Sequence, residues 1–502
     1  MEHSCLRSPA TIHVDWSATV RSILFIFLFL GFVDDSRAQS PHWSIGTGAT
    51  PMALAGDYRA LGWNPAQLTF SPLNDEWKSA MGGMEGGISL RSTVFEREDL
   101  WNDIWNREAS TENWTGLERS EWVNRLSNEE IQIDGDILTA GTAKKWGKWG
   151  VAYTSRNVMS AEAFLSSSTS ELLIEGGAAE WFELVITASG DTVPNSGDWD
   201  ANDLLTIVGG LDTNGDAVLA ELLQDSRLGF SWHRAHEVGI SKEWGSKRGW
   251  TIHTGIGGKL LLGNGFFQLR DHNGELDAFG AFSNGLQIPQ LDSLNSGGTG
   301  IDNLRKWGPV GQGFGLDFGV VIEFSNRLWA SCSITDIGWM EWRGERYSIN
   351  GMILNTWNEA ATNPAGWMDV MSNALNPSTW FSQATKETRR IPNGVGFHIG
   401  GGYKVGEFLT LAADATFDNQ ELLGNAGTRL GTSALLNITP LFRFDMGIRK
   451  LGGETFRFPA GFLFKSGKSG IEIGLQAGDI QGLWKSTQPE LAAHFCFLRW
   501  VW

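Results

Sequence analysis

The chain has 502 residues, enough for one large domain or several small ones. Hydrophobic residues make up 41% and charged residues 19%, which is too apolar for a disordered chain and too polar for a bundle of membrane helices. A net charge of −18 argues against nucleic acid as a partner. With 63 Gly and 25 Trp but only 4 Tyr, the composition is typical of a large β-structure with aromatic rims.

The first 38 residues have the pattern of a secretory signal peptide. Arg21 precedes an apolar run from Ile23 to Val33, and Ser36 and Ala38 supply the small residues that a signal peptidase reads. The run is too short to cross a bilayer as a helix. We therefore expect export, with residues 1–38 removed by cleavage after Ala38.

No later stretch is apolar for long enough to form a membrane helix, and hairpins recur instead. Six tight turns rich in Gly, Asn, Pro or Ser join alternating segments into pairs. The turns lie at 146–149, 245–249, 325–327, 404–407, 439–441 and 466–470. One further strand at about 80–94 and a last one at 491–502 bring the expected number to fourteen. Short turns at one end and long loops at the other predict an all-β fold, a transmembrane outer-membrane β-barrel of about 14 antiparallel strands over residues 79–502.

The strands alternate as a barrel wall requires. Phe444 and Met446 share one face of their segment, while Arg443 and Asp445 share the other. A soluble β-sandwich could also alternate, but it would not place aromatic residues at the strand ends. Such residues flank the tight turns here and predict a girdle at a membrane interface. They include Trp146, Trp149, Trp244, Trp250, Phe324, Trp329 and Phe408.

The last strand ends the chain with an aromatic row. Trp502, Trp500, Leu498 and Cys496 alternate with Arg499, so we expect the row to face lipid and Arg499 to face the lumen. A plain edge strand this apolar would aggregate unless it were paired by closure of the barrel. Trp500 and Trp502 look like the terminal tag read by the outer-membrane assembly machinery, which makes that machinery an expected partner.

Two cysteines remain after the predicted cleavage, Cys332 in the seventh expected strand and Cys496 in the fourteenth. These strands lie roughly opposite each other in a ring of fourteen. A disulfide needs Cα atoms within about 7 Å, and such a barrel is wider than that. We expect both thiols to be free.

The N-terminal part of the mature chain carries a recognisable pattern. Residues 44–70 are rich in small residues and include Leu61-Gly62-Trp63-Asn64-Pro65-Ala66. This resembles the small-residue, Asn-Pro-Ala segment of FadL-type and PorV-type outer-membrane barrels. The glycine-rich stretch 313–319 followed by 333–342, and the stretch 391–403, resemble an uncharacterised branch of that superfamily. The resemblance implies a fourteen-stranded barrel with residues 39–78 tucked inside as a hatch, whose motif is Asn64 and Pro65.

Motifs that would indicate an enzyme are missing from the sequence. It lacks the His-Glu-x-x-His, Gly-x-Ser-x-Gly and phosphate-loop patterns, so we expect no enzymatic activity. Charges expected in the lumen, such as Asp317 and Glu472, could form a catalytic carboxylate pair, but barrel lumens are polar by default. His233 and His236, expected in a loop, lack further metal ligands nearby.

The second long connection, expected at 157–235, is strongly acidic. Residues 157–226 hold 13 acidic residues and no Lys or Arg. We expect this loop to face the exterior, since both termini of an even-stranded barrel are periplasmic and its tight turns lie on that side.

The same connection holds the first half of a calcium loop, although Ala217 stands where such loops have Gly and Leu223 where they have Glu. Two interpretations stay open: a solvated acidic loop with no cofactor, or a Ca²⁺ site within 198–225. The candidate ligands are Asp212, Asn214 and Asp216.

The fourth long connection, about 343–391, carries apolar residues at helical spacing. They could form a small helix packed on the barrel mouth, or an apolar surface that captures a hydrophobic molecule. The candidate ligand-binding residues are Trp357, Trp367, Met371 and Leu375.

These patterns lead to two functional hypotheses for a protein of the bacterial outer membrane, surrounded by its lipid. The first is a FadL-like passive transporter of small hydrophobic molecules. The second is a PorV-like component of a secretion or surface-attachment system, which binds a secreted protein.

Overall fold

A computed structural model describes most of the chain from residue 49 onward, and the predicted signal peptide lies outside the described residues. The described ranges are 49–72, 77–92, 94, 116–127, 129–197, 199, 206–213, 219–245, 249–272, 275–283, 308–325, 327–347, 356–357, 384–419, 426–452, 456–466, 470–483 and 490–502. No helix among them is both long and apolar enough to cross a membrane, which says nothing about strands.

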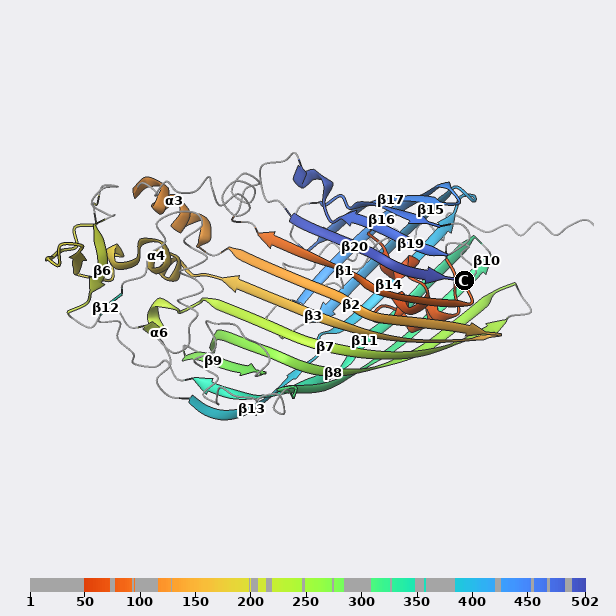
Figure 1. Cartoon of the computed structure of the whole chain (residues 1–502), viewed down its shortest axis with the longest axis horizontal. Coiled ribbons are helices and arrows are strands. Elements are labelled where there is room, and N and C mark those ends of the chain that lie inside the picture. The colour runs from red at the N-terminus through yellow and green to blue at the C-terminus, as the bar shows by residue number, and fades with distance from the viewer. Residues whose placement is uncertain are drawn as a thin grey trace, which may run out of the picture.

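Fourteen antiparallel strands close into a barrel, which confirms the predicted number of strands (Figure 1). The chain reverses at 146–149, 404–407 and 439–441 as predicted, and the other three turns include residues outside the described part. The ring closes where β20 pairs with β1, with Val501 opposite Ala80. Two further strands, β9 (Glu275–Phe282) and β13 (Ala384–Pro392), pair beside β8 and β11. In order around the ring the strands are β1 (Ser79–Ser92), β2 (Glu130–Trp146), β3 (Trp149–Phe164), β7 (Arg227–Gly245), β8 (Thr251–His272), β10 (Gly311–Ser325), β11 (Leu328–Tyr347), β14 (Val395–Lys404), β15 (Leu409–Asn419), β16 (Ala426–Thr439), β17 (Phe442–Leu451), β18 (Ala460–Lys465), β19 (Ile471–Ala477) and β20 (Glu490–Val501).

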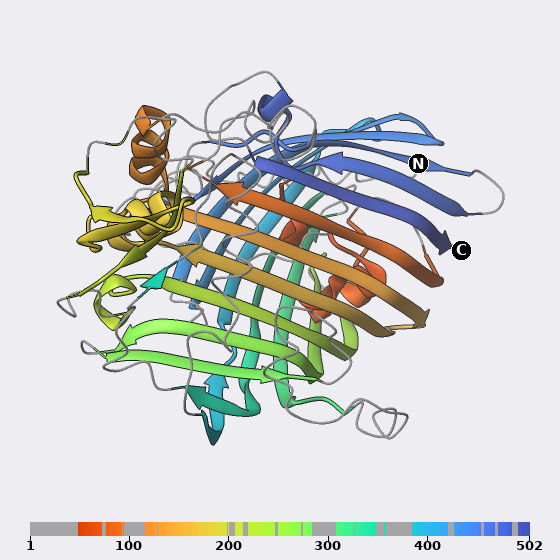
Figure 2. The ribbon, with the colours of Figure 1, turned by 60° about the vertical axis from the view of Figure 1, so that its left-hand side comes forward.

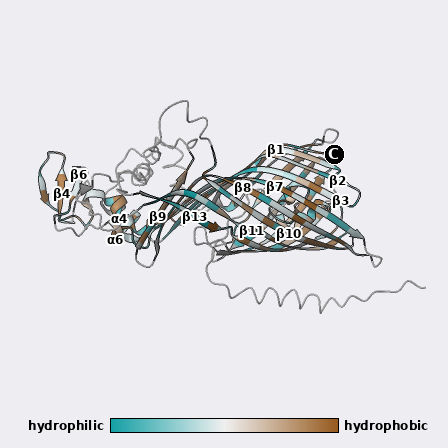
Figure 3. Cartoon of the chain, turned by 90° about the horizontal axis from the view of Figure 1, so that it is seen from below, coloured by the Kyte–Doolittle hydropathy of each residue, from teal (hydrophilic) through white to brown (hydrophobic). Residues whose placement is uncertain are grey.

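The wall is apolar outside and polar inside, as the alternation predicts. On β10, Leu316, Phe318 and Val320 are exposed, whereas Asp317 between them is buried in the lumen. Figure 3 shows the same alternation of apolar and polar residues along the barrel strands. Trp146 and Trp244 are among the aromatic residues exposed beside the tight turns, but the predicted place of Trp329 in this girdle is wrong, because it is buried against the plug, where its Nε1 donates to Ala53 O. An apolar exterior with an aromatic girdle is the surface of a transmembrane barrel.

Bulges shift this alternation at two places that the sequence pattern does not reveal. In β11, Asp336 is an extra residue with a φ of 63°, and it separates inward-facing Thr335 from inward-facing Met340. In β20, a register shift opposite Ile473 turns Cys496 into the lumen, so its predicted place on the lipid-facing row is wrong.

The rest of that row is exposed as predicted, because the bulge leaves Leu498, Trp500 and Trp502 on the outer face. Cys332 is exposed and Cys496 buried, and both thiols are free, which confirms the prediction.

The long connections build a folded cap at the end of the barrel opposite the C-terminus (Figure 1). Strands β3 and β7 run further than the bounds 157–235 suggest, so the acidic connection is only 165–226. It folds around a hydrophobic core that includes Leu172, Ile174 and Phe182. We call residues 116–127, 165–226 and 356–357 the cap. Its elements are α3 (Gly116–Leu126), α4 (Ser167–Glu175), η5 (Gly176–Ala178), β4 (Leu184–Thr187), β5 (Thr192–Pro194), β6 (Ile207–Leu211), α6 (Leu219–Leu222) and β12 (Thr356–Trp357).

Residues 49–72, which we call the plug, lie inside the barrel (Figure 2). The plug contains three short helical turns, α2 (Pro51–Leu54), η2 (Asp57–Ala60) and η3 (Pro65–Leu68), and almost all of its side chains are buried. Its small residues allow the backbone to approach the wall closely, so a folded peptide fills the lumen beside the tight turns.

Candidate functional site

The Asn-Pro pair holds the plug against the wall. Asn64 caps η3, where its Oδ1 accepts a hydrogen bond from the Ala66 N–H at 3.0 Å. Its Nδ2 donates to the main-chain oxygens of Val320 (3.3 Å) and Cys332 (3.4 Å) on two adjacent strands. The structure therefore gives this pair an anchoring contact on β10 and β11.

Ion pairs fix the plug to the opposite part of the wall. Arg59 lies 2.9 Å from Glu85 of β1, and Asp57 pairs with Arg499 of β20. Arg499 also pairs with Glu472, which therefore forms part of a salt-bridged interior. Because these groups are buried, loss of one partner would leave a charge unpaired in the lumen.

A cavity of about 180 Å³ lies between the plug and the wall. Trp63 lines it from the plug, and Leu261, Met340 and Trp342 supply apolar surface from the wall. An apolar cavity of about 150 Å³ is large enough to hold benzene. The cavity therefore has room for a molecule about the size of one aromatic ring.

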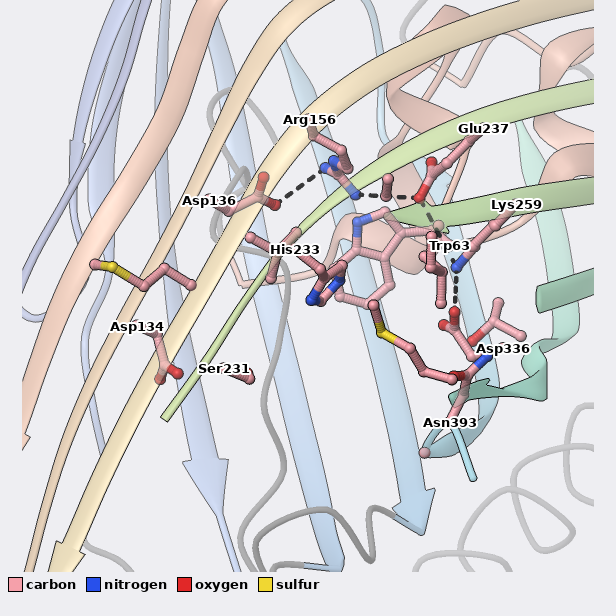
Figure 4. Close-up of a pocket in the computed structure, with 18 of the residues that line it drawn as sticks. Trp63, Asp134, Asp136, Arg156, Ser231, His233, Glu237, Lys259, Asp336 and Asn393 are labelled. Atoms are coloured by element: carbon pink, nitrogen blue, oxygen red, sulfur yellow. Dashed lines mark hydrogen bonds and ion pairs between the residues drawn. The ribbon is translucent and has the colours of Figure 1, made fainter. Parts of the chain in front are cut away.

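One side of the cavity is a chain of charged side chains, most of them buried (Figure 4). The Lys259 ammonium is 2.7 Å from Asp336, 3.4 Å from Asp317 and 3.9 Å from Glu237. Lys259 comes from β8 and these three carboxylates from β11, β10 and β7, so one cation ties together four strands.

The chain of charges continues to β2 and β3 and meets the plug. Arg156 lies 3.1 Å from Asp136 and 3.8 Å from Glu237. A β-carbon at Gly62 of the plug would lie 3.1 Å from Nη1 of Arg156, so the plug backbone passes close to the charges. The φ of 81° at Gly62 is one that glycine adopts readily.

The cavity also reaches an irregular part of the wall. β11 pairs with β14 as far as Thr335 and with β13 only from Trp339 onward, so residues 336–338 interrupt the ladder. Asn393 bridges the interruption: its N–H donates to Gly338 O (3.0 Å) and its Nδ2 to Phe314 O (2.8 Å). Asp336 and Asn393 both line the cavity.

The structure separates the two histidines considered as metal ligands. Both lie in β7 rather than in a loop, because β7 begins at Arg227. His233 lines the cavity, whereas His236 contacts the Tyr153 hydroxyl on the exposed side of the wall at 2.9 Å. Residues three apart in a strand face opposite ways, so they cannot share an ion. In the described part of the chain, no three His, Cys, Asp or Glu residues are grouped as a metal site requires.

The other candidate residues fall mostly outside the described part of the chain. Asp212 is buried directly after β6. Asn214 and Asp216 lie outside the described residues, so calcium binding stays a prediction. Trp357 is described only by its backbone, in β12 beside Gly210 of β6. Its three proposed companions in ligand binding also lie outside the described residues, namely Trp367, Met371 and Leu375.

Sequence reasoning missed the residues that form the cavity. Trp63 stands inside the recognised motif, but nothing in the pattern marks it as a binding residue. Asp136, Arg156, Glu237 and Lys259 occupy inward positions on four long strands, and only the register brings them together. The sign of these residues in the sequence is a charge at a strand position that faces the lumen.

The fold and the site together define a class: an outer-membrane-type β-barrel filled by its own N-terminal plug, with a small cavity above the plug. Residues 222–420 match the model of a family described as a family of unknown function, DUF5723. No curated protein matches the chain.

Solved structures of FadL-type barrels are similar to this one. The toluene transporter TodX of Pseudomonas putida matches at 10% identity and a TM-score of 0.38, over 91% of this chain and 96% of that one. The toluene transporter TbuX of Ralstonia pickettii matches at 11% and 0.42, over 93% and 99%. A FadL homologue of Pseudomonas aeruginosa matches at 8% and 0.42, also over 93% and 99%. Identities this low indicate a shared fold and do not identify binding residues in this chain.

Proposed function

We propose that the protein is an outer-membrane transport barrel that passes small, largely apolar molecules through the cavity beside its plug. The observation that carries this proposal is the cavity itself, which combines a partly apolar lining with a size that suits one ring. In this arrangement the cap faces the exterior and the tight turns face the periplasm.

The interrupted ladder at residues 336–338 supports the proposal. A wall that is fully hydrogen-bonded resists opening, because each buried backbone group left without a partner costs free energy. At this interruption the Asn393 side chain reaches past β11 and donates to Phe314 O of β10. The wall can therefore part beside the cavity at a lower cost than elsewhere.

Uptake by intact cells tests the proposal, because the lipopolysaccharide leaflet blocks apolar solutes that would cross plain liposomes. Cells that make the full-length protein should take up labelled toluene at low concentration faster than cells without it. Ala235→Trp should abolish the gain, since Ala235 is buried and lines the cavity.

The matched control is Val238→Trp, which adds the same side chain to the exposed face of the same strand. This variant should keep the faster uptake. Equal uptake with and without the protein, at normal surface levels, would rule out the proposal. Equal uptake by the wild type and Ala235→Trp would remove the cavity from the route.

No contact of the described residues favours the alternative of a protein-binding secretion component. That alternative depends on the N-terminal pattern alone, so we propose transport.

A further inference from the structure

The outer face of β11 leaves the lipid layer at Trp339. Leu328 beside a tight turn, Ile334 and Ile337 are exposed on this face. Trp339 follows, with the centre of its ring 4.2 Å from that of Phe314. A strand rises roughly 3.3 Å per residue at a tilt of about 40°, so Trp339 lies about 27 Å from Leu328 along the membrane normal, across an apolar band about 25 Å tall. Trp339 therefore lies at the lipid–water interface nearer the cap, where aromatic side chains gather.

Two unpaired cations lie on the outer face just beyond Trp339. β13 pairs with β11 and carries Lys386 and Arg390 at exposed positions four residues apart, which share one face of the strand. The Arg390 guanidinium lies 3.5 Å from the centre of the Trp339 ring. Inward-facing Arg389 pairs with Asp277 at 2.7 Å, whereas no carboxylate of the described residues pairs with Lys386 or Arg390. The charges of these two side chains are therefore available to a ligand.

A hollow of about 400 Å³ lies in the outer face beside these cations. Lys386 and Thr388 line it from β13, and Phe282 lines it from β9. Tyr347, the last residue of β11, also lines it and belongs to the hydrophobic core of the cap. Figure 3 shows β9 and β13 between the cap and the rest of the barrel. The hollow therefore lies between the apolar band and the cap, at the depth of a lipid headgroup.

The charges around the hollow favour an anion. Arg343 pairs with Glu341 at 3.7 Å, so these two charges offset each other. Of the carboxylates that line the hollow, Glu387 pairs with Arg389 at 3.0 Å, which leaves Glu345. Two unpaired cations against one carboxylate make this patch positive, on a chain whose net charge is −18. Ammonium, guanidinium and hydroxyl groups together suit a phosphate, which is the anionic group of many membrane lipids.

We propose that this hollow binds the phosphate headgroup of a lipid of the outer leaflet. Lys386 and Arg390 attract the phosphate, and the Thr388 hydroxyl donates a hydrogen bond to it. The acyl chains of the same lipid then lie against the apolar face of β11 below Trp339. The site depends on the proposed function only for the orientation, in which the cap faces the exterior, and it involves no cargo.

Binding of lipid A to the purified full-length protein in detergent tests the site. Lipid A carries phosphates, and its dephosphorylated form keeps the sugars and the acyl chains. Native mass spectrometry gives the fraction of protein that carries a lipid as the lipid concentration rises. Each cation near a lipid phosphate contributes about fivefold in affinity, so phosphorylated lipid A should bind about tenfold or more tightly than the dephosphorylated form.

Single charge deletions locate the site. Lys386→Gln and Arg390→Gln change exposed side chains, so each variant should fold and should bind phosphorylated lipid A about fivefold more weakly. The matched controls are Lys148→Gln and Arg327→Gln, which remove the same charges from exposed positions in tight turns at the opposite end of the barrel. Both controls should bind as the wild type does. Compact migration in an unheated denaturing gel shows that each variant is folded.

Equal binding of the two forms of lipid A would overturn the proposed headgroup site. Unchanged binding in Lys386→Gln and Arg390→Gln would overturn it, and so would an equal loss in the variants and their controls. Displacement of lipid A by an equal concentration of inorganic phosphate would show that the hollow takes free phosphate and not a lipid. None of these results bears on transport, which the uptake of toluene decides separately.

Discussion

Oδ1 of Asn64 in the plug occupies the space that a β-carbon on Gly319 of β10 would need. Gly255 of β8 relates in the same way to Pro65 and Ala66. Glycine at an inward position of a strand marks a close approach of another backbone. Glycine at these two inward positions of the wall therefore leaves the space that the plug backbone and side chains occupy.

Gly319→Ala is expected to push Asn64 away from the wall and to lower the free energy of unfolding by about 1–3 kcal/mol, the usual cost of overpacking. The measurement is the shift in the urea midpoint of the purified barrel. The control is Gly258→Ala on β8, where a β-carbon meets no atom within 4 Å. An unchanged midpoint in Gly319→Ala would mean that the plug is not packed as described.

Lys259→Met should destabilise the barrel strongly, because it leaves Asp336, Asp317 and Glu237 without their shared cation. Removing one partner of a buried ion pair typically costs about 3–5 kcal/mol. The temperature at which the barrel loses its compact migration in a denaturing gel should fall accordingly.

Arg343→Met is the control for that variant. Its pair with Glu341 spans 3.7 Å between largely exposed side chains, and such surface pairs contribute about 0–1 kcal/mol. If this temperature fell equally in both variants, the buried ion pairs of Lys259 would contribute no more to the stability of the barrel than an exposed pair.

The sequence predicts the barrel well because its signals are local. Turn residues and alternation can each be recognised from a few neighbouring positions. They place the strand ends correctly, for example at the turn between Trp146 and Trp149. Bulges are different, since the extra residue Asp336 is an ordinary aspartate that only the register shift between β10 and β11 reveals. The place of Cys496 was wrong for the same reason.

The cavity was beyond sequence reasoning because its parts are far apart in the chain. Trp63, Asp136 and Trp342 come together only when strand register and plug position are known. The cap was missed because its core is built by short apolar stretches of several connections, such as Leu172 in α4 and Leu222 in α6, and not by one periodic segment.

The cap should loosen as the pH rises. Burial raises the pKa of Glu171 in α4 from its ordinary 4.5 to about 7. The Glu180 N–H, which donates to Glu171 Oε1 at 2.8 Å, lowers this pKa, and the negative charges of Glu180 and Glu175 raise it. Between pH 4.5 and 7 the folded cap keeps a proton that the opened cap releases, so its stability falls through this window. Amide hydrogen exchange of α4, corrected for intrinsic rates, should therefore show more opening at neutral than at acidic pH.

Glu171→Gln should flatten that dependence, because a neutral amide has no proton to lose. Glu221→Gln, which alters an exposed carboxylate of α6, should leave it intact. The same pH profile in Glu171→Gln and the wild type would assign the effect to another group.

Trp502→Asp is expected to reduce the amount of barrel inserted in the outer membrane. Trp500 and Trp502 are exposed on the outer face, and the main-chain oxygen of Trp502 accepts hydrogen bonds from Lys78 and Ser79 at the seam. A charge on the lipid-facing row costs free energy, and loss of the aromatic end removes the predicted assembly tag. The amount of heat-modifiable protein in outer-membrane fractions measures this; an undiminished amount would refute the role of Trp502.

The central claim is that a small molecule binds between the plug and the wall. Crystals of the full-length protein soaked in 4-bromophenol give the most direct measurement, because bromine scatters anomalously. The account predicts an anomalous peak inside the barrel, bordered by Trp63, Asp136 and Trp342. A peak confined to the cap or the outer surface, with this cavity empty, would contradict it.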